Sequence, residues 1–184
     1  ARGPGCGGGE KVAQFVRTVL ETVENPVVLD ADGLAAYQGS PEGLKSRPGP
    51  TVLTPHSGEL GRLLDIESSE VDAERIGSAR EAAERSGCIV LLKGFRTIVA
   101  APGGEAVLVD AGGPVLATGG TGDVLTGVIA ALLAGNVEPF TAAWAGACLH
   151  GAAGEELART IGDRGVLAGD VADRLPLTMA GLTR

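Results

Sequence analysis

Three glycines precede an aspartate in residues 117–123 (ATGGTGD), which lead into the apolar residues 124–134. Glycines in a turn that enters a helix expose consecutive backbone N–H groups, and with the helix N-terminus these groups form a cradle for an anion. An ordinary cap needs one Asp or Ser, whereas Gly119, Gly120 and Gly122 each lose backbone entropy on folding. We therefore interpret this segment as a phosphate-binding loop.

Asp123 follows these glycines and falls in the first turn of the predicted helix. One interpretation is a capping carboxylate, because negative charge is favoured at the positive end of the helix dipole. The other is a general base beside a bound phosphoryl group, where the carboxylate takes a proton from a substrate hydroxyl. We favour the base, since the neighbouring glycines already indicate a phosphate site.

Two basic side chains, Lys93 and His56, follow short apolar runs that are typical of strands. Lys93 comes directly after residues 88–92, where burial of its charge is unfavourable unless it meets an anion. It is either a phosphate ligand or a solvated lysine at the end of a strand. His56 lies in a turn, where a histidine is either exposed or functional. By contrast, His150 lies within the apolar residues 139–159, and we expect it to be packed in the core.

Carboxylates occur in similar positions. Glu59 is either a capping partner in the first turn of a helix or part of a water-bridged magnesium shell. Ser57 is the expected N-cap of that helix. Asp32 is expected to cap a short helix at residues 34–37, and no role is assigned to Asp30, which ends the preceding strand.

The apolar pattern predicts strands that alternate with helices. The predicted strands are residues 27–29, 51–53 and 88–92, followed by an antiparallel hairpin of 97–101 and 106–109. The predicted helices are residues 10–24, 34–37, one beginning at 57, 70–86, 124–134, 139–159 and 166–175. This alternation is typical of an α/β sandwich with a mainly parallel sheet, which binds ligands at the carboxyl ends of its strands. No linker or repeat divides the chain, so we expect one domain.

Composition excludes several classes of partner. The 184 residues carry 15 Lys and Arg against 23 Asp and Glu, a formal charge of −8, whereas nucleic acids bind clustered basic residues. No apolar run reaches the ~20 residues of a membrane span, and the first residues lack the apolar core of a secretory signal. The three cysteines, Cys6, Cys88 and Cys148, form no ligand pair. We expect reduced thiols in a cytoplasmic protein without nucleic-acid or membrane partners.

Four collinear segments carry a family resemblance: VLDADGL at 28–34, TPHSGEL at 54–60, LKGFRTIV at 92–99 and TGGTGDVLTG at 118–127. Together they resemble the ADP-dependent NAD(P)H-hydrate dehydratases, members of the ribokinase-like superfamily that often form the C-terminal half of a bifunctional repair enzyme. The resemblance implies a three-layer α/β/α ribokinase-like fold with a mainly parallel central sheet, as a single domain over residues 1–184.

The resemblance also implies a reaction. ADP phosphorylates the hydroxyl at C6 of the S-form of hydrated NADH or NADPH (NADHX or NADPHX), phosphate then leaves, and NAD(P)H and AMP are formed. ADP is the implied co-substrate, with Mg²⁺, and the implied base is Asp123. The family's hydrate-binding residues map to Gly3, Gly5, His56 and Asp123. Its nucleotide-binding residues map to Lys93, Gly94, Phe95, Arg96, Thr97, Gly119, Gly120, Thr121 and Gly122.

The chain begins at Ala1 and reaches the Gly-Pro-Gly turn of residues 3–5 at once, although a strand usually precedes such a turn. We therefore expect an N-terminally truncated domain that self-associates or is poorly soluble, and that binds ADP better than the hydrate. A homo-oligomer is expected, together with fusion to, or partnership with, an NAD(P)H-hydrate epimerase.

Two alternative functions share some of these residues. An ATP-dependent ribokinase-like kinase of a vitamin precursor would use the same glycine loop and Asp base but would release a stable phosphorylated alcohol. A non-catalytic remnant would bind nucleotide or partners without turnover. The segment TPHSGEL favours the dehydratase over the kinase, and an intact Asp123 disfavours a remnant.

Overall fold

The computed structural model describes residues 9–182 of the chain. Its strands are β1 (Val27–Leu29), β2 (Thr51–Leu53), β3 (Ile89–Leu92), β4 (Thr97–Ala100) and β5 (Ala106–Val109). Its helices are α1 (Glu10–Thr22), α2 (Asp32–Ala35), α3 (Ser57–Leu64), α4 (Ser68–Ala73), α5 (Arg75–Ser86), α6 (Thr121–Ala134), α7 (Pro139–Thr160) and α8 (Ala168–Leu182), with 3₁₀ turns η1 (Pro41–Leu44) and η2 (Pro114–Leu116).

The five described strands form one sheet in the order β1-β2-β3-β4-β5. Strands β1, β2 and β3 are parallel, and β4 and β5 form the antiparallel hairpin that the sequence predicts. In register, Leu29 lies opposite Leu53, and Leu53 lies opposite Val90. The carboxyl ends of the three parallel strands therefore meet at one edge of the sheet, where the polar residues that follow them are brought together.

Side chains of alternating strand residues enter two separate cores, as the period of a β-strand requires. On one face, Leu29, Leu53 and Leu92 pack with residues of α1, α3 and α5. On the other face, Val52 and Leu91 pack with residues of α6 and α7. The strands are consequently apolar on both sides, which explains their unbroken hydrophobic runs.

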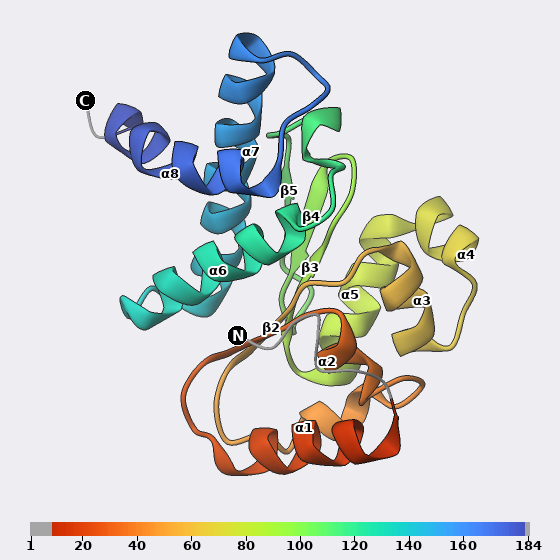
Figure 1. Cartoon of the computed structure of the whole chain (residues 1–184). Coiled ribbons are helices and arrows are strands. Elements are labelled where there is room, and N and C mark those ends of the chain that lie inside the picture. The colour runs from red at the N-terminus through yellow and green to blue at the C-terminus, as the bar shows by residue number, and fades with distance from the viewer. Residues whose placement is uncertain (1–8, 183–184) are drawn as a thin grey trace.

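Helices cover both faces of the sheet, with α6, α7 and α8 on one side and α3, α4 and α5 on the other (Figure 1). This arrangement confirms the predicted three-layer α/β/α sandwich with a mainly parallel sheet. Among the residues that the structure describes, no helix is long and apolar enough to cross a membrane.

Several predicted helix boundaries are wrong. The predicted helix 70–86 is two helices, α4 and α5, because Glu74 leaves helical geometry with φ −132° and ψ 52°. The last helix, α8, extends well past residue 175 and contains Pro176. Its Thr178 donates a hydrogen bond to Glu156 of α7 at 3.1 Å. The short helix begins at Asp32 rather than at residue 34.

Both predicted caps are also wrong. The N-cap of α3 is His56 and not Ser57: His56 has extended backbone, and its Nδ1 accepts hydrogen bonds from the N–H groups of Gly58 (3.0 Å) and Glu59 (3.3 Å). Asp32 is the first residue of α2 and makes no side-chain cap, so its carboxylate is directed elsewhere.

Candidate nucleotide and phosphate site

The glycine loop leads into α6 without a side-chain cap. Gly120 occupies the N-cap position with φ 88°, a conformation that favours glycine over other residues. Within residues 9–182, the backbone N–H groups of Gly119, Gly120 and Gly122 have no hydrogen-bond partner. Because the first N–H groups of a helix need an acceptor from outside it, the arrangement can bind an anion at the positive end of α6.

A pocket of about 420 Å³ lies beside this loop, a volume in the range of small-ligand sites. Its walls are residues 93–97 after β3, residues 110–114 after β5, Leu116 and Ala117, Thr121, Gly122 and Leu125 from α6, and Ala147 and His150 from α7. The structure thus brings the predicted nucleotide residues Lys93–Thr97 together with Thr121 and Gly122. Gly119, Gly120 and Asp123 do not line the pocket, although they adjoin residues that do.

The loop from Lys93 to Thr97 turns sharply between β3 and β4. Gly94 has φ 143° and Arg96 has φ 57°, so both lie in the region disfavoured for most side chains. Phe95 is 84% exposed, and the Arg96 guanidinium lies 5.3 Å from the centre of its ring. Arg96 also pairs with Asp110 across the pocket wall at 3.1 Å. The loop therefore presents an aromatic face and a cation at the rim of the pocket.

Lys93 is not the solvated strand-end lysine that the sequence left open. Its Nζ donates to Asp30 Oδ1 at 2.7 Å and lies 3.7 Å from Glu59 Oε2, and its side chain is 21% exposed. Asp30 is 3% exposed and also accepts a hydrogen bond from Thr126 Oγ1 at 3.3 Å. Gly122 stands close by, since a Cβ on this residue would be 3.6 Å from Lys93 Nζ.

Sequence reasoning assigned no role to Asp30 and did not single out Thr126. The signal for Asp30 was present: a carboxylate directly after a buried strand, at the same sheet edge as Lys93. Thr126 gave no such signal, because it lies inside an apolar helix and only the packing of α6 on the sheet brings it to Asp30.

His56 and Glu59 form a reciprocal capping box at the start of α3, which bears out the capping interpretation of Glu59. The His56 N–H donates to Glu59 Oε2 at 2.8 Å. The same oxygen faces Lys93, so one carboxylate serves both the helix and the lysine. The His56 side chain is 55% exposed and lines neither described pocket.

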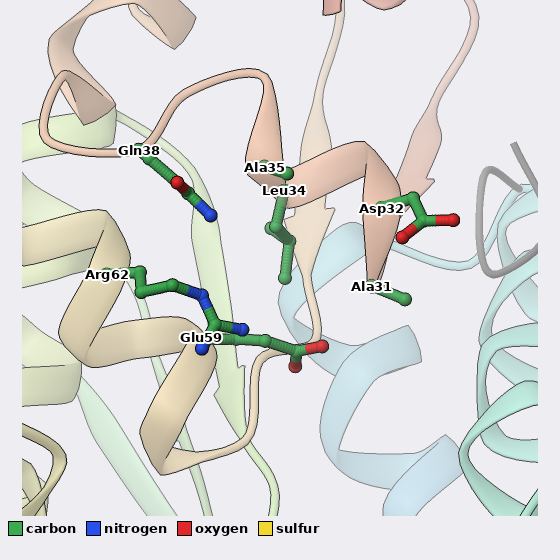
Figure 2. A pocket seen from close by; sticks show the side chains of 7 residues that line it. All are labelled: Ala31, Asp32, Leu34, Ala35, Gln38, Glu59 and Arg62. Carbon is green, nitrogen blue, oxygen red and sulfur yellow. The ribbon is translucent and has the colours of Figure 1, made fainter. Parts of the chain in front are cut away.

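A second pocket of about 230 Å³ lies between α2 and α3. Figure 2 shows Leu34 of α2 and Glu59 and Arg62 of α3 facing one another across it, with Asp32 at one end. Lys93 lines the larger pocket and Glu59 lines this one, so their contact joins the two.

Asp123 lies in the first turn of α6 and is exposed. Its carboxylate makes no hydrogen bond or ion pair with residues 9–182. It is one residue from Gly122, which lies near Lys93 Nζ, so a carboxylate without a partner in residues 9–182 stands beside the glycine loop. The predicted hydrate residues Gly3 and Gly5, like Cys6, lie outside the described residues.

His150 is buried, as expected, but it also lines the larger pocket. Its Nε2 is buried and has no hydrogen-bond partner among the described residues. Burial lowers the pKa of His150 to about 4, with a smaller opposing effect from the backbone of Thr121.

Burial also raises the pKa of the Cys88 thiol to about 11, so this cysteine is a poor nucleophile.

The residues that the structure describes include no group of three His, Cys, Asp or Glu side chains placed to hold a metal ion. Mg²⁺ commonly binds through one or two carboxylates together with substrate phosphates, so a protein cage is not needed for nucleotide-bound Mg²⁺. Glu59 fits that requirement, since it lines the smaller pocket and contacts Lys93, which lines the larger one, whereas both oxygens of the buried Asp30 are already hydrogen-bonded.

The chain resembles known proteins in both sequence and structure. A profile described as NAD(P)H-hydrate dehydratase matches residues 1–177. The chain is 42% identical over 182 residues to the bifunctional NAD(P)H-hydrate repair enzyme Nnr of Moorella thermoacetica. The matched segment covers 99% of this chain and 34% of that protein. It is 40% identical over 178 residues to the ADP-dependent (S)-NAD(P)H-hydrate dehydratase of Neisseria meningitidis, covering 91% of this chain and 59% of that protein.

Two solved structures show the same fold. The ADP/ATP-dependent NAD(P)H-hydrate dehydratase of Bacillus subtilis, co-crystallised with ATP and Mg²⁺, has a TM-score of 0.85 and 33% identity, covering 94% of this chain and 60% of that one. A ribokinase-like superfamily protein of Enterococcus faecalis has a TM-score of 0.77 and 29% identity, covering 95% of this chain and 60% of that one. The chain thus spans about a third to three fifths of the lengths of these proteins.

The α/β/α sandwich, with a glycine loop entering a helix beside a ligand-sized pocket, defines a ribokinase-like protein. Within that class, the extent of the family match decides the assignment. The chain belongs to the NAD(P)H-hydrate dehydratase family.

Proposed function

We propose that this chain carries the ADP-dependent dehydration of the S-form of hydrated NADH or NADPH. Its reaction transfers the β-phosphoryl group of ADP to the C6 hydroxyl of the hydrate, leaving AMP. Phosphate is then eliminated and the reduced dinucleotide is regenerated. Elimination needs this activation, because hydroxide is a poor leaving group near neutral pH.

One observation carries the proposal: residues 93–97 and 121–122, distant in sequence, form the wall of one ligand-sized pocket beside unpaired backbone N–H groups. These are the positions to which the family's nucleotide-binding residues map. Lys93 and the N-terminus of α6 supply positive charge for the phosphates, and Phe95 and the apolar wall supply surface for the base.

Asp123 is the proposed general base. Its carboxylate has no partner in residues 9–182, so no existing interaction has to break before it accepts the proton of the C6 hydroxyl. It directly follows Gly122, which lines the larger pocket, and this neighbourhood supports the proposal. His56, which is exposed at the start of α3, is the proposed contact for the hydrate, together with Gly3 and Gly5.

Mg²⁺ is the proposed counterion of the nucleotide, as the Bacillus subtilis relative was crystallised with ATP and Mg²⁺. Glu59 is the carboxylate proposed to approach it, through water. When bound, the ion would neutralise phosphate charge. The capping box would hold Glu59 in place for this contact.

The decisive experiment incubates the chain with NADHX and ADP and follows recovery of the absorbance band of reduced nicotinamide. Dehydration that needs ADP and releases AMP and phosphate in equal amounts supports the proposal. Adenosine in place of ADP is the matched control, because it lacks the group to be transferred. A stable phosphorylated product made from ATP and a vitamin-type alcohol would instead indicate the kinase, and nucleotide binding without turnover would indicate a remnant.

Cytoplasmic location, self-association and an NAD(P)H-hydrate epimerase partner remain predictions of the family resemblance. The relatives named bifunctional repair enzymes are about three times as long as the matched segment, so an additional activity resides elsewhere in those proteins. We propose that the present chain acts alongside an epimerase that converts the other form of the hydrate into the S-form.

A further inference from the structure

We infer that Asp30 is a positioning residue that fixes the ammonium of Lys93 at the phosphate end of the nucleotide pocket. The inference rests on the proposed function for its consequence in turnover, but its geometric content is independent of which reaction the chain performs. Asp30 lies in the segment VLDADGL at 28–34, but it is not among the site residues predicted from the sequence. It lines neither described pocket.

The carboxylate of Asp30 is fully engaged. Oδ1 accepts from Lys93 Nζ at 2.7 Å, and Oδ2 accepts from Thr126 Oγ1 at 3.3 Å. Its side chain is 4% exposed, whereas the lysine that it holds is 21% exposed. A carboxylate this deep is costly to bury unless it is paired, and the exposed end of the pair faces the pocket.

The carboxylates of Asp30 and Glu59 both lie near the ammonium of Lys93. Lys93 Nζ is 2.7 Å from Asp30 and 3.7 Å from Glu59, so Asp30 makes the closer contact and keeps the lysine at the end of β1, beside Gly122. Without Asp30, the nearest remaining anion is Glu59, which lines the smaller pocket. The ammonium would then move toward Glu59 and away from the glycine loop. Lys93 would keep its charge, but the charge would no longer lie beside Gly122.

If the Asp30–Lys93 pair only stabilised the fold, Lys93 would not need to line a ligand-sized pocket. Lys93 nevertheless lines the larger pocket, and Gly122 leaves the space next to its Nζ free of side chain. Charge placement affects a transition state more than ground-state binding when the developing charge must be met at a fixed position. We therefore expect loss of Asp30 to lower kcat more than it weakens ADP binding.

The first test measures Lys93 directly. The chain has three lysines, Lys11, Lys45 and Lys93, so limited reductive methylation followed by peptide mass spectrometry compares Lys93 with two internal standards. In Asp30→Asn, the rate of Lys93 methylation relative to the other two should rise at least threefold, because the amine loses its anchoring carboxylate. Thr126→Val removes the other partner of Asp30 and should leave this ratio within twofold of the wild-type value.

The second test is a double-mutant cycle in kcat, with the Kd of ADP measured by calorimetry for each variant. Asp30→Asn should lower kcat at least tenfold and weaken ADP binding less than fivefold. In a Lys93→Met background, the same substitution should change kcat less than twofold, because its effect passes through the lysine. Asp30→Glu, which keeps the charge but displaces it, is the second variant and should also lower kcat while ADP binding is retained.

An unchanged methylation ratio in both Asp30 variants would overturn the inference, as would effects of Asp30→Asn and Lys93→Met that simply add. A wild-type chain that binds ADP without dehydrating NADHX would refute the proposed function alone, since the methylation ratio and ADP affinity would still report on Asp30. Equal losses in ADP affinity and kcat would also count against positioning, because they would show a general loss of the site.

Discussion

A side chain that removes a proton has to be free of other partners in the resting protein, and Asp123 meets this condition in the described chain. Its neighbours differ in this respect. Asp30 and Glu59 are both held by Lys93, and Glu59 also caps α3. Three carboxylates at one end of the sheet thus have separate tasks that follow from their contacts.

Asp123→Asn is expected to lower kcat by at least the ~10²-fold typical of a lost general base, because the amide cannot accept the proton. Nucleotide affinity should change little, since the carboxylate does not line the pocket. Steady-state kinetics with NADHX, together with ADP titration, measure both quantities. Turnover close to that of the wild type would rule out Asp123 as the base.

Gly122→Ala is expected to weaken ADP binding at least tenfold, about 1.4 kcal/mol, because the new methyl group occupies the space beside Lys93 Nζ. Its thermal stability should be unchanged or slightly higher, since alanine favours helices. Gly127→Ala is the matched control: it lies on the same helix with nothing within 4 Å of the added Cβ. Calorimetric titration that gives equal ADP affinity for both variants would contradict a phosphate site at Gly122.

Among the elements, α7 packs unusually closely on its neighbours. A Cβ on Gly151 would be 2.6 Å from the carbonyl carbon of Ala111, and one on Gly146 would be 2.8 Å from Ile129. These glycines let the helix approach the loop after β5 and α6, both of which form walls of the larger pocket. The same close packing buries His150.

Burial of His150 on α7 predicts a pH dependence of stability. Its pKa is lowered from 6.5 to about 4 in the folded chain, chiefly by desolvation, so the unfolded state binds more protons between these values. The contribution of neutral His150 to the free energy of unfolding is therefore complete above pH 6.5 and is lost as the pH falls toward 4. Denaturant unfolding should show wild-type stability falling about 3 kcal/mol more than that of His150→Gln over this interval. Parallel pH profiles of the two proteins would show that His150 is not buried in its neutral form.

On the scale of the whole molecule, the larger pocket draws its walls from the loop after β3, the first residue of β4, the loop after β5 with η2, and helices α6 and α7. The Asp30–Lys93 pair links the ends of β1 and β3. A ligand that fills this pocket contacts elements from both the sheet and one helical layer. Binding is therefore coupled to the folding of the whole sandwich.

ADP is expected to raise the Tm of the chain, with a stabilisation of about 2.7 kcal/mol at 100 times its Kd. Adenosine should raise Tm much less at the same concentration, because it has no phosphates for the N–H groups of the glycine loop. Differential scanning fluorimetry with matched concentrations distinguishes the two ligands. Equal shifts would mean that the loop does not bind phosphate.

The sequence alone determined the elements whose signals are local. The parallel strands, the hairpin and the glycine loop follow from apolar runs and from glycines at fixed positions. Lys93, Glu59 and Asp123 were singled out because their residue types follow strands or enter helices. Such features need only neighbouring residues, so they can be read without the fold.

Only the tertiary structure decided which residues meet. Asp30 and Lys93 are separated by 63 positions, and Asp30 and Thr126 by 96, so their contacts depend on strand order and on the packing of α6 across the sheet. His56 displaced Ser57 as the cap of α3 because its ring nitrogen reaches two N–H groups. The burial of His150 within the wall of the pocket depends on α7 approaching the loop after β5. The His56 cap is a local contact with Gly58 and Glu59. In the other cases the deciding energy comes from contacts between distant segments, which local patterns do not specify.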